Sequence, residues 1–458
     1  MKRGGTTKRG LAAYLAAVFL LSAFVQSAPS QVQRYGISST ILENGLEVIA
    51  VENHNVPLVT ITIAVKSGAC TEPPAYDGLS HLYEHMFFKG NKAISNQESY
   101  LERLRELGVE LGRLANGSTS TESTLYFITL RRDYLEQGMI FMKDAIQSPL
   151  FDEEELEMEK RVVLAEYDRA EATPRRCLQQ EVDKRLWYKY PWRKDVLGDR
   201  EIITTATQDK MLTIQKKFYI PNNSALIIAG DIDPKEIFNM AGEIFADWQR
   251  REDPFMKYPV PRHPLLEEVQ EIVIVRPVNT ISILIGFHGP SVSEDERATY
   301  AADVLSCILN NPASGFQKNL VDSGLFTSCS VAYRTQEYTG PITIFARTNT
   351  QNLNTARKAL IEEVQRIGQE DYFSDEGLKN ARQRLEAQQV YDVELASMFA
   401  YTLGSWWCST GLDYYLDYIP NVKRITREDV EDYINTYITG KPFVIGVLLS
   451  QEDKELLT

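Results

Sequence analysis

The apolar positions near the start of the folded chain follow the two-residue period of β-strands. ILENGLEVIAVE (41–52) places two β-rich runs around Asn44-Gly45, the residue pair that tight hairpin turns favour, so it predicts a β-hairpin. LVTITIAVKSG (58–68) and STLYFITL (123–130) predict two further strands. Apolar residues recur at helical spacing over 96–108 and 132–147. This mixture of strands and helices predicts an α+β unit over residues 36–250.

The same order of patterns starts again in the second half of the chain. Residues 251–268 are rich in proline and charge and lack periodicity, which is typical of a linker. A strand is then predicted over 280–290 and a helix over 297–309, as in the first half. We therefore expect a duplication: two homologous mixed α/β domains in tandem, each an antiparallel-rich sheet flanked by helices. The second domain would occupy 269–458.

The first 28 residues differ from the rest of the chain. MKRGGTTKRG carries four basic residues and no acidic one, and residues 11–25 are almost wholly apolar. A mostly apolar run of fifteen residues is too short to span a bilayer but fits the central region of a signal peptide. Small residues follow, and we expect cleavage after Ser27 or Ala28 and export to the periplasm or the exterior. The alternative is an uncleaved leader that anchors the chain in a membrane.

Composition and charge narrow the possible partners. Hydrophobic residues make up 43% and charged residues 24% of the 458, which is ordinary for a folded protein. Without the leader, 45 basic residues would face 63 acidic ones, a net charge of −18. A surface this acidic repels nucleic acid. The five cysteines are scattered without metal-type spacing, so we expect them to be small buried hydrophobic residues.

The segment GLSHLYEHMFFKG (78–90) carries the candidate chemistry. His81 and His85 are four residues apart, so on a helix they share one face at about 6 Å and can bind one metal ion. Glu84 lies one residue away from that line, too poorly aimed to be a ligand but able to act on a water molecule. The order H-x-x-E-H is the inverted zinc-peptidase motif. In the alternative, both histidines lie on a solvated helix face and have no metal.

A third protein ligand is needed for a catalytic zinc site. The helix predicted within 151–174 starts with a cap at Asp152 and carries Glu159 and Glu166, seven residues or nearly two turns apart. Val162 and Val163 share their face, which predicts that it is buried. Because a buried carboxylate needs a partner, Glu166 is the candidate ligand. Ion pairs with basic residues of the same helix are the alternative.

These motifs resemble the pitrilysin/insulinase-type zinc peptidases, which include mitochondrial processing peptidase and its bacterial relatives. The resemblance covers nearly all of the chain after the leader. It is most specific in GLSHLYEHMFFKG, in SPLFDEEELEMEKRVVLAE (148–166) and in FYIPNNSALIIAGDID (218–233). It implies one Zn²⁺ per chain, held by His81, His85 and Glu166.

The resemblance also implies roles for three further residues. Glu84 would be the general base, and Glu159 a carboxylate that supports the site. Asn116, in LANGSTST, would bind the substrate backbone beside the active site. The expected activity is that of a zinc metalloendopeptidase acting on unfolded peptides, with the strand through 111–119 pairing with the substrate. A non-catalytic assembly subunit and a zinc-dependent peptide-binding chaperone are the alternatives.

In the family that these motifs resemble, the full active site is a closed chamber of four such domains. This chain supplies two, so we expect a clam-shell dimer. The opposite domain would contribute an Arg and a Tyr that hold the substrate. The matching segment here, 340–360, has Arg347 and Arg357 but no tyrosine, and Tyr338 precedes it. We therefore predict a heterodimer with a related second chain, and a homodimer is the alternative.

Overall fold

The computed structural model describes residues 36–189, 195–392 and 396–457. The predicted signal peptide, residues 1–28, lies outside these described residues. None of the described helices combines the length and the apolar character that crossing a membrane requires.

The first sheet has six strands in the order β1-β2-β6-β3-β5-β4. Only β2 and β6 pair in parallel, and the other neighbours are antiparallel. The strands are β1 (Ile37–Ile41), β2 (Glu47–Glu52), β3 (Leu58–Val65), β4 (Ala115–Thr119), β5 (Thr124–Arg131) and β6 (Ser224–Gly230). The sheet is therefore antiparallel-rich, as the sequence predicts.

The second sheet has five strands in the order β7-β11-β8-β10-β9, again with one parallel pair, β7 with β11. Its strands are β7 (Gln270–Val275), β8 (Ile281–His288), β9 (Ser328–Tyr333), β10 (Pro341–Thr348) and β11 (Val444–Leu449). The order matches β2-β6-β3-β5-β4 of the first sheet position by position. Two tandem domains of one topology, each a sheet flanked by helices, are thus confirmed.

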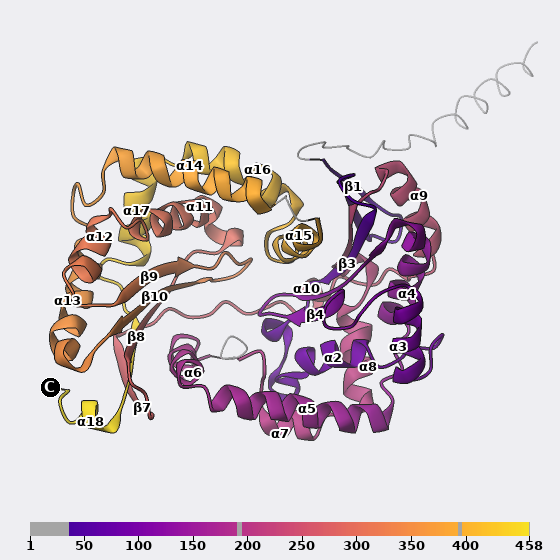
Figure 1. Cartoon of the computed structure of the whole chain (residues 1–458), viewed down its shortest axis with the longest axis horizontal. Helices are drawn as coiled ribbons and strands as arrows, with labels where there is room; N and C mark the ends of the chain where they lie inside the picture. Colours follow the sequence, from indigo (N-terminus) through magenta and orange to yellow (C-terminus); the bar gives the residue numbers. More distant parts are fainter. Residues whose placement is uncertain (1–35, 190–194, 393–395, 458) are drawn as a thin grey trace, which may run out of the picture.

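The helices cover both sheets and lie in two lobes (Figure 1). In the first half they are α2 (Leu79–Phe87), α3 (Gln97–Glu106), α4 (Leu135–Gln147), α5 (Glu153–Glu171), α6 (Pro174–Leu186), α7 (Arg200–Thr204), α8 (Gln208–Phe218), α9 (Pro234–Ile244) and α10 (Pro254–Lys257). In the second half they are α11 (Val292–Leu309), α12 (Gly315–Gln317), α13 (Leu353–Arg366), α14 (Asp375–Asp392), α15 (Ala396–Thr410), α16 (Leu412–Arg424), α17 (Arg427–Tyr437) and α18 (Gln451–Lys454).

The hairpin between β1 and β2 forms where the Asn-Gly pair predicts it. Gly45 has φ +89°, a backbone conformation that favours glycine. The Asn44 side chain accepts the N–H of Leu46 at 3.1 Å and donates to the carbonyl of Phe245 at 2.9 Å. The turn is thereby tied to the end of α9, and the strands pair in the register Ile41↔Glu47.

Each half lends one helix to the sheet of the other half. Helix α15, from the second half, packs against β3, β5 and β6, and α6, from the first half, packs against β8, β11 and β7. Figure 1 shows α15 between the lobes, beside the first sheet. Close approach depends on glycine in both cases: a Cβ on Gly404 would lie 2.7 Å from Leu125, and one on Gly446 would lie 2.7 Å from Leu178. The two halves therefore share their cores.

All five cysteines lie in the described residues, and no disulfide joins any of them there. Four of them, Cys70, Cys177, Cys329 and Cys408, are buried, and Cys307 is half-buried. For these four the structure agrees with the interpretation as small buried hydrophobic residues.

Two histidines outside the candidate motif are also buried, at the junction of α6, β8 and the linker. His263 and His288 pack with ring centroids 5.0 Å apart, and His288 stacks on Trp187 at 4.7 Å. His288 Nε2 lies 2.7 Å from the carbonyl oxygen of Leu186. Burial lowers the pKa of His288 to about 4, although this hydrogen bond opposes the shift. Both histidines are therefore structural.

We expect His288 to make the fold sensitive to acid. Its ordinary pKa of 6.5 applies to the unfolded chain, which therefore takes up the proton first as the pH falls. The free energy of unfolding keeps its full value above pH 6.5. It falls by roughly 2–3 kcal/mol as the pH falls towards about 4. In His288→Gln, the amide can still donate to Leu186 but does not titrate. Urea unfolding at pH 7 and pH 4.5 should show a smaller loss in the variant, and equal losses would contradict the prediction.

Candidate metal centre

Helix α2 carries the histidine pair, and a buried carboxylate fixes where the helix begins. Gly78 precedes it with φ +90°, and a Cβ there would lie 2.7 Å from the carbonyl oxygen of Leu197. The Glu72 carboxylate accepts the N–H of Gly78 at 2.9 Å and of Ser80 at 2.6 Å. These amides have no partner within the helix, and a negative charge at its N-terminus is favourable. The apolar positions of α2 face the core.

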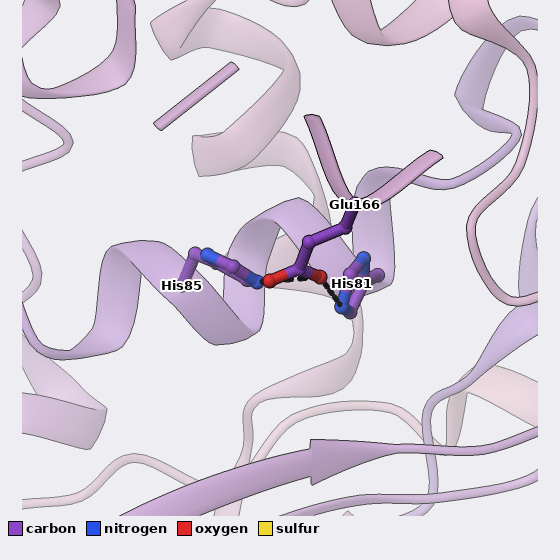
Figure 2. A group of neighbouring side chains, drawn as sticks. All are labelled: His81, His85 and Glu166. Atoms are coloured by element: carbon purple, nitrogen blue, oxygen red, sulfur yellow. Dashed lines mark ion pairs between the residues drawn. The ribbon is translucent and has the colours of Figure 1, made fainter. Parts of the chain in front are cut away.

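The histidines of α2 meet Glu166 of α5 above this buried face. Glu166 Oε2 lies 3.7 Å from His81 Nε2 and 3.8 Å from His85 Nε2 (Figure 2). One ligand atom from each of the three residues lies within 4.8 Å of the other two. The structure thus brings together the three ligands that the sequence and the resemblance suggest, although 80 residues separate His85 from Glu166.

The three side chains fit a zinc ion in both spacing and chemistry. Bonds of about 2.0–2.1 Å in a tetrahedron put neighbouring ligand atoms about 3.3 Å apart. The two distances from Glu166 to the histidines, 3.7 and 3.8 Å, are slightly longer. Two imidazoles and one carboxylate are the ligand types that catalytic zinc uses. Burial, together with the neighbouring His85, lowers the pKa of His81 to about 4, so this ring is in the neutral form that binds a metal.

Glu159 holds His85 from the side opposite Glu166. The Glu159 side chain is only 7% exposed and lies 2.9 Å from His85 Nδ1 and 2.6 Å from Lys89 Nζ. Burial raises the pKa of Glu159, but the hydrogen bonds from His85 and Lys89 outweigh it and lower the pKa. Burial lowers the pKa of His85, but the hydrogen bond to Glu159 and the surrounding carboxylates outweigh it, so the pKa of His85 is raised. Glu159 therefore orients His85 with its Nε2 towards Glu166.

The face of α5 that carries the two glutamates is less buried than the sequence predicts. Glu159 and Val163 are buried, whereas Val162 is 42% exposed. The expectation of a wholly buried face is therefore wrong at Val162. The stripe along which α5 packs is narrower than the helix face that positions 159, 162, 163 and 166 share. Glu166 is half-buried, and its other oxygen, Oε1, lies 3.7 Å from Arg169. The ion pair within the helix and the approach to the histidines thus occur together, one at each oxygen.

Replacing Glu159 with glutamine is expected to weaken zinc binding about 10- to 100-fold, because the orienting charge on His85 is lost. A glutamine of the same shape would also leave Lys89 without its carboxylate. Competition with a fluorescent zinc chelator measures the affinity directly. Glu157→Gln is a matched control on the same helix, because Glu157 is exposed and pairs with Lys160. An unchanged zinc affinity in Glu159→Gln would show that His85 is held without it.

Glu84 lies between the histidine pair and strand β4. The Thr119 hydroxyl donates to Glu84 Oε2 at 2.8 Å, and a Cβ on Gly117 would lie 2.7 Å from Glu84 Cγ. The carboxylate therefore lies directly over the strand. Burial raises the pKa of Glu84, and the hydrogen bond from Thr119 and the charge of His85 oppose that rise. A carboxylate beside a metal site with little solvent is suited to accept a proton.

Asn116 lies on β4 but on the other side of the strand. Successive strand residues point to opposite faces, so Asn116 and Ser118 point away from Glu84. Ser118 accordingly hydrogen-bonds to Tyr401 of α15. The Asn116 side chain is exposed, and its Oδ1 accepts the N–H of Gly117 at 2.9 Å. Among the contacts that the structure describes, none joins Asn116 to the histidines or to Glu166.

Sequence reasoning did not find three residues that the structure adds to the site: Glu72, Lys89 and Thr119. Lys89 follows His85 by four residues, a spacing that in a continuous helix would place both on one face and could have suggested a shared partner. Thr119 contacts Glu84 from a distant part of the chain, and Glu72 contacts the start of α2 from the turn before it. The spacing of the sequence carries no comparable signal for them.

A pair of histidines on one helix, a glutamate from another and a carboxylate beside them form the site of metallopeptidases with the inverted motif. Two family sequence profiles match the chain: "Insulinase (Peptidase family M16)" over residues 47–200 and "Peptidase M16 inactive domain" over 205–385. The chain belongs to peptidase family M16, and the resemblance drawn from its motifs is confirmed.

Individual relatives agree with the family. An "Uncharacterized zinc protease" of Rickettsia bellii is 25% identical over 348 residues, which are 76% of this chain and 81% of that protein. A protease from Helicobacter pylori has a similar structure, with a TM-score of 0.78 at 20% identity over 90% of this chain and 99% of that one. The first half of the periplasmic protease PqqL of Escherichia coli has a TM-score of 0.77 at 17% identity, over 94% and 95%. These two structures support the fold.

Proposed function

We propose that this chain is a zinc-dependent metalloendopeptidase that hydrolyses unfolded peptides or small polypeptides. The observation that carries the proposal is the convergence of His81, His85 and Glu166 on one point, with the Glu84 carboxylate beside them. A bound zinc ion would polarise the carbonyl of the scissile peptide bond and acidify a water molecule.

Glu84 supplies the acid-base chemistry of this proposal. As general base it takes a proton from the attacking water, and it then delivers that proton to the amine that leaves. Glu84 lies over β4, the edge strand of the first sheet, and is therefore next to any peptide that lies along this strand.

Strand β4 offers an open edge to such a peptide. Thr129 N–H bonds to the Leu114 carbonyl, and Ser120 N–H to the Ser123 carbonyl, at the two ends of the β4–β5 pairing. Bonded pairs alternate in antiparallel sheets, so Gly117 and Thr119 direct their backbone groups away from β5. An extended substrate can add there as a further strand, which gives affinity with little side-chain selectivity. Asn116 currently accepts the N–H of Gly117, so it would exchange that bond for one to the substrate backbone.

The proposal extends to a partner chain and a closed chamber. In the second half Arg347 is exposed on β10, Arg357 bonds to Glu271 at 2.5 Å, and the Tyr338 N–H donates to Glu122. The contacts of these three residues therefore differ from one another. We therefore propose a heterodimer with a related chain that supplies the Arg and Tyr. High turnover of peptide by this chain alone, as a homodimer, would contradict it.

The proposed location is the periplasm or the exterior, after cleavage of the leader. The basic start and apolar run of residues 1–28 support export. Among the similar structures, PqqL of Escherichia coli is described as a periplasmic protease.

Metal content and peptide turnover together test the function. Purified protein, alone or with its co-purified partner, should contain one zinc per copy of this chain, and the complex with the partner should cleave an internally quenched unstructured peptide. A chelator should stop cleavage, and added zinc should restore it. Peptide binding that needs zinc but gives no cleavage would favour the chaperone alternative. A chain that neither binds zinc nor cleaves would be an assembly subunit.

A further inference from the structure

We propose that Thr119 is a positioning residue that holds the Glu84 carboxylate in its working orientation. The inference rests on the proposed peptidase function and adds a member to its site. It is carried by the direct contact between the Thr119 hydroxyl and Glu84 Oε2, at 2.8 Å.

The contact fixes a group that otherwise turns freely. The last torsion of a glutamate side chain has a broad, roughly two-fold preference, so packing alone sets the plane of its carboxylate poorly. A hydroxyl donated to one oxygen selects one orientation of that plane and identifies Oε2 as the acceptor. Glu84 Oε1 is then left for the proton that moves during hydrolysis.

The strand places Thr119 at the right position by its two-residue period. Ala115, Gly117 and Thr119 share the face of β4 that turns towards α2. Ala115 is buried, and Gly117 has no side chain, which leaves room for Glu84 to lie across the backbone. Thr119 is therefore the one hydroxyl on this face of β4. Its strand is held at the other face by the bond between Ser118 and Tyr401.

The contact also links substrate binding to the general base. Thr119 lies on the edge strand β4, beside which a peptide would add, and both its hydroxyl and its backbone N–H interact with the Glu84 carboxylate. The same residue thus sets the distance between the bound peptide and the group that moves the proton. Misplacement of a reacting group by about 1 Å can cost 100-fold in rate, so such a link bears on turnover.

The test compares three substitutions at this position. Thr119→Val keeps the shape and removes the donor, and kcat should fall about tenfold with KM within about twofold and unchanged zinc content. Thr119→Ser keeps the donor and should restore kcat to within about threefold of the unmodified enzyme. Thr119→Ala removes both methyl and hydroxyl and should match Thr119→Val, which also covers the case in which the valine variant does not fold.

Thr62→Val is the matched control. Thr62 is a buried threonine of β3 whose hydroxyl has no hydrogen-bond partner among the described residues, so the same change there should leave kcat unaltered. In a double-mutant cycle, Thr119→Val should have no further effect on the residual turnover of Glu84→Gln, because it acts only through Glu84. A purely structural role would lower both backgrounds equally.

The outcomes separate this inference from the function on which it rests. If the unmodified protein cleaves no peptide in any state, the proposed function fails. If it cleaves peptides and Thr119→Val retains full kcat, the function stands and the role of Thr119 is overturned. Equal losses in Thr119→Ser and Thr119→Val would also overturn it, since the hydroxyl would then not be the group that matters.

Discussion

Glu84→Gln is expected to abolish peptide hydrolysis while the protein keeps its zinc. The amide has the shape of the carboxylate and can still accept the hydroxyl of Thr119, but it cannot take a proton from water. General-base catalysis contributes about 100- to 10,000-fold to the rate, so kcat should fall at least about 100-fold. The metal ligands are untouched, and zinc content measured by mass spectrometry should stay at one per chain.

The control for this variant is Glu136→Gln, which makes the same change at an exposed position of α4. It should retain both zinc and activity. Full activity in Glu84→Gln, with zinc bound, would remove Glu84 from the mechanism and leave the general base to be found elsewhere.

Cutting the chain at its linker is expected to give two halves that do not fold alone. Residues 36–250 without α15 would expose the face of the first sheet that Phe399, Leu403 and Trp407 now cover. Burying each such side chain contributes about 1.5–3 kcal/mol, so three of them approach the whole stability of a domain, about 5–15 kcal/mol. The half 269–458 would lose the cover that α6 provides.

Separate and joint expression of the two halves tests this directly. Each half alone should be insoluble or unfold without cooperativity in urea, whereas the two expressed together should form a soluble complex. A chain nicked within 251–268 after folding should stay associated. A cooperative unfolding transition in either isolated half would contradict the prediction.

Local sequence patterns predicted much of this fold for physical reasons. The hairpin at Asn44-Gly45, the strand at 58–68 and the helix with the His81–His85 pair depend on neighbours in the chain, so their spacing is sufficient. The antiparallel-rich sheets in two tandem domains followed from the repeated order of those patterns. The candidate ligand Glu166 needed more, because only its position on a helix and the family resemblance pointed to it.

The rest depends on contacts that spacing does not encode. The pattern of an amphipathic helix indicates that one face is buried but not which sheet it covers. The sequences of 174–186 and 396–410 therefore did not predict that α6 and α15 each pack on the sheet of the other half. The exposure of Val162 reflects the width of the contact that α5 makes. The bond between Thr119 and Glu84 joins residues 35 apart, and two side chains of ordinary type give no signal of it.

The exchange of α6 and α15 bears on the ancestry of the chain. The two helices follow α5 and α14 at equivalent places in the two copies, and each completes the sheet of the other copy. This is the arrangement of a domain-swapped dimer whose subunits have been joined through 251–268. An ancestral chain with a single copy would then have folded only as a homodimer. The two copies have also evolved under mutual constraint: the copy without the metal motif supplies part of the scaffold on which the histidines stand.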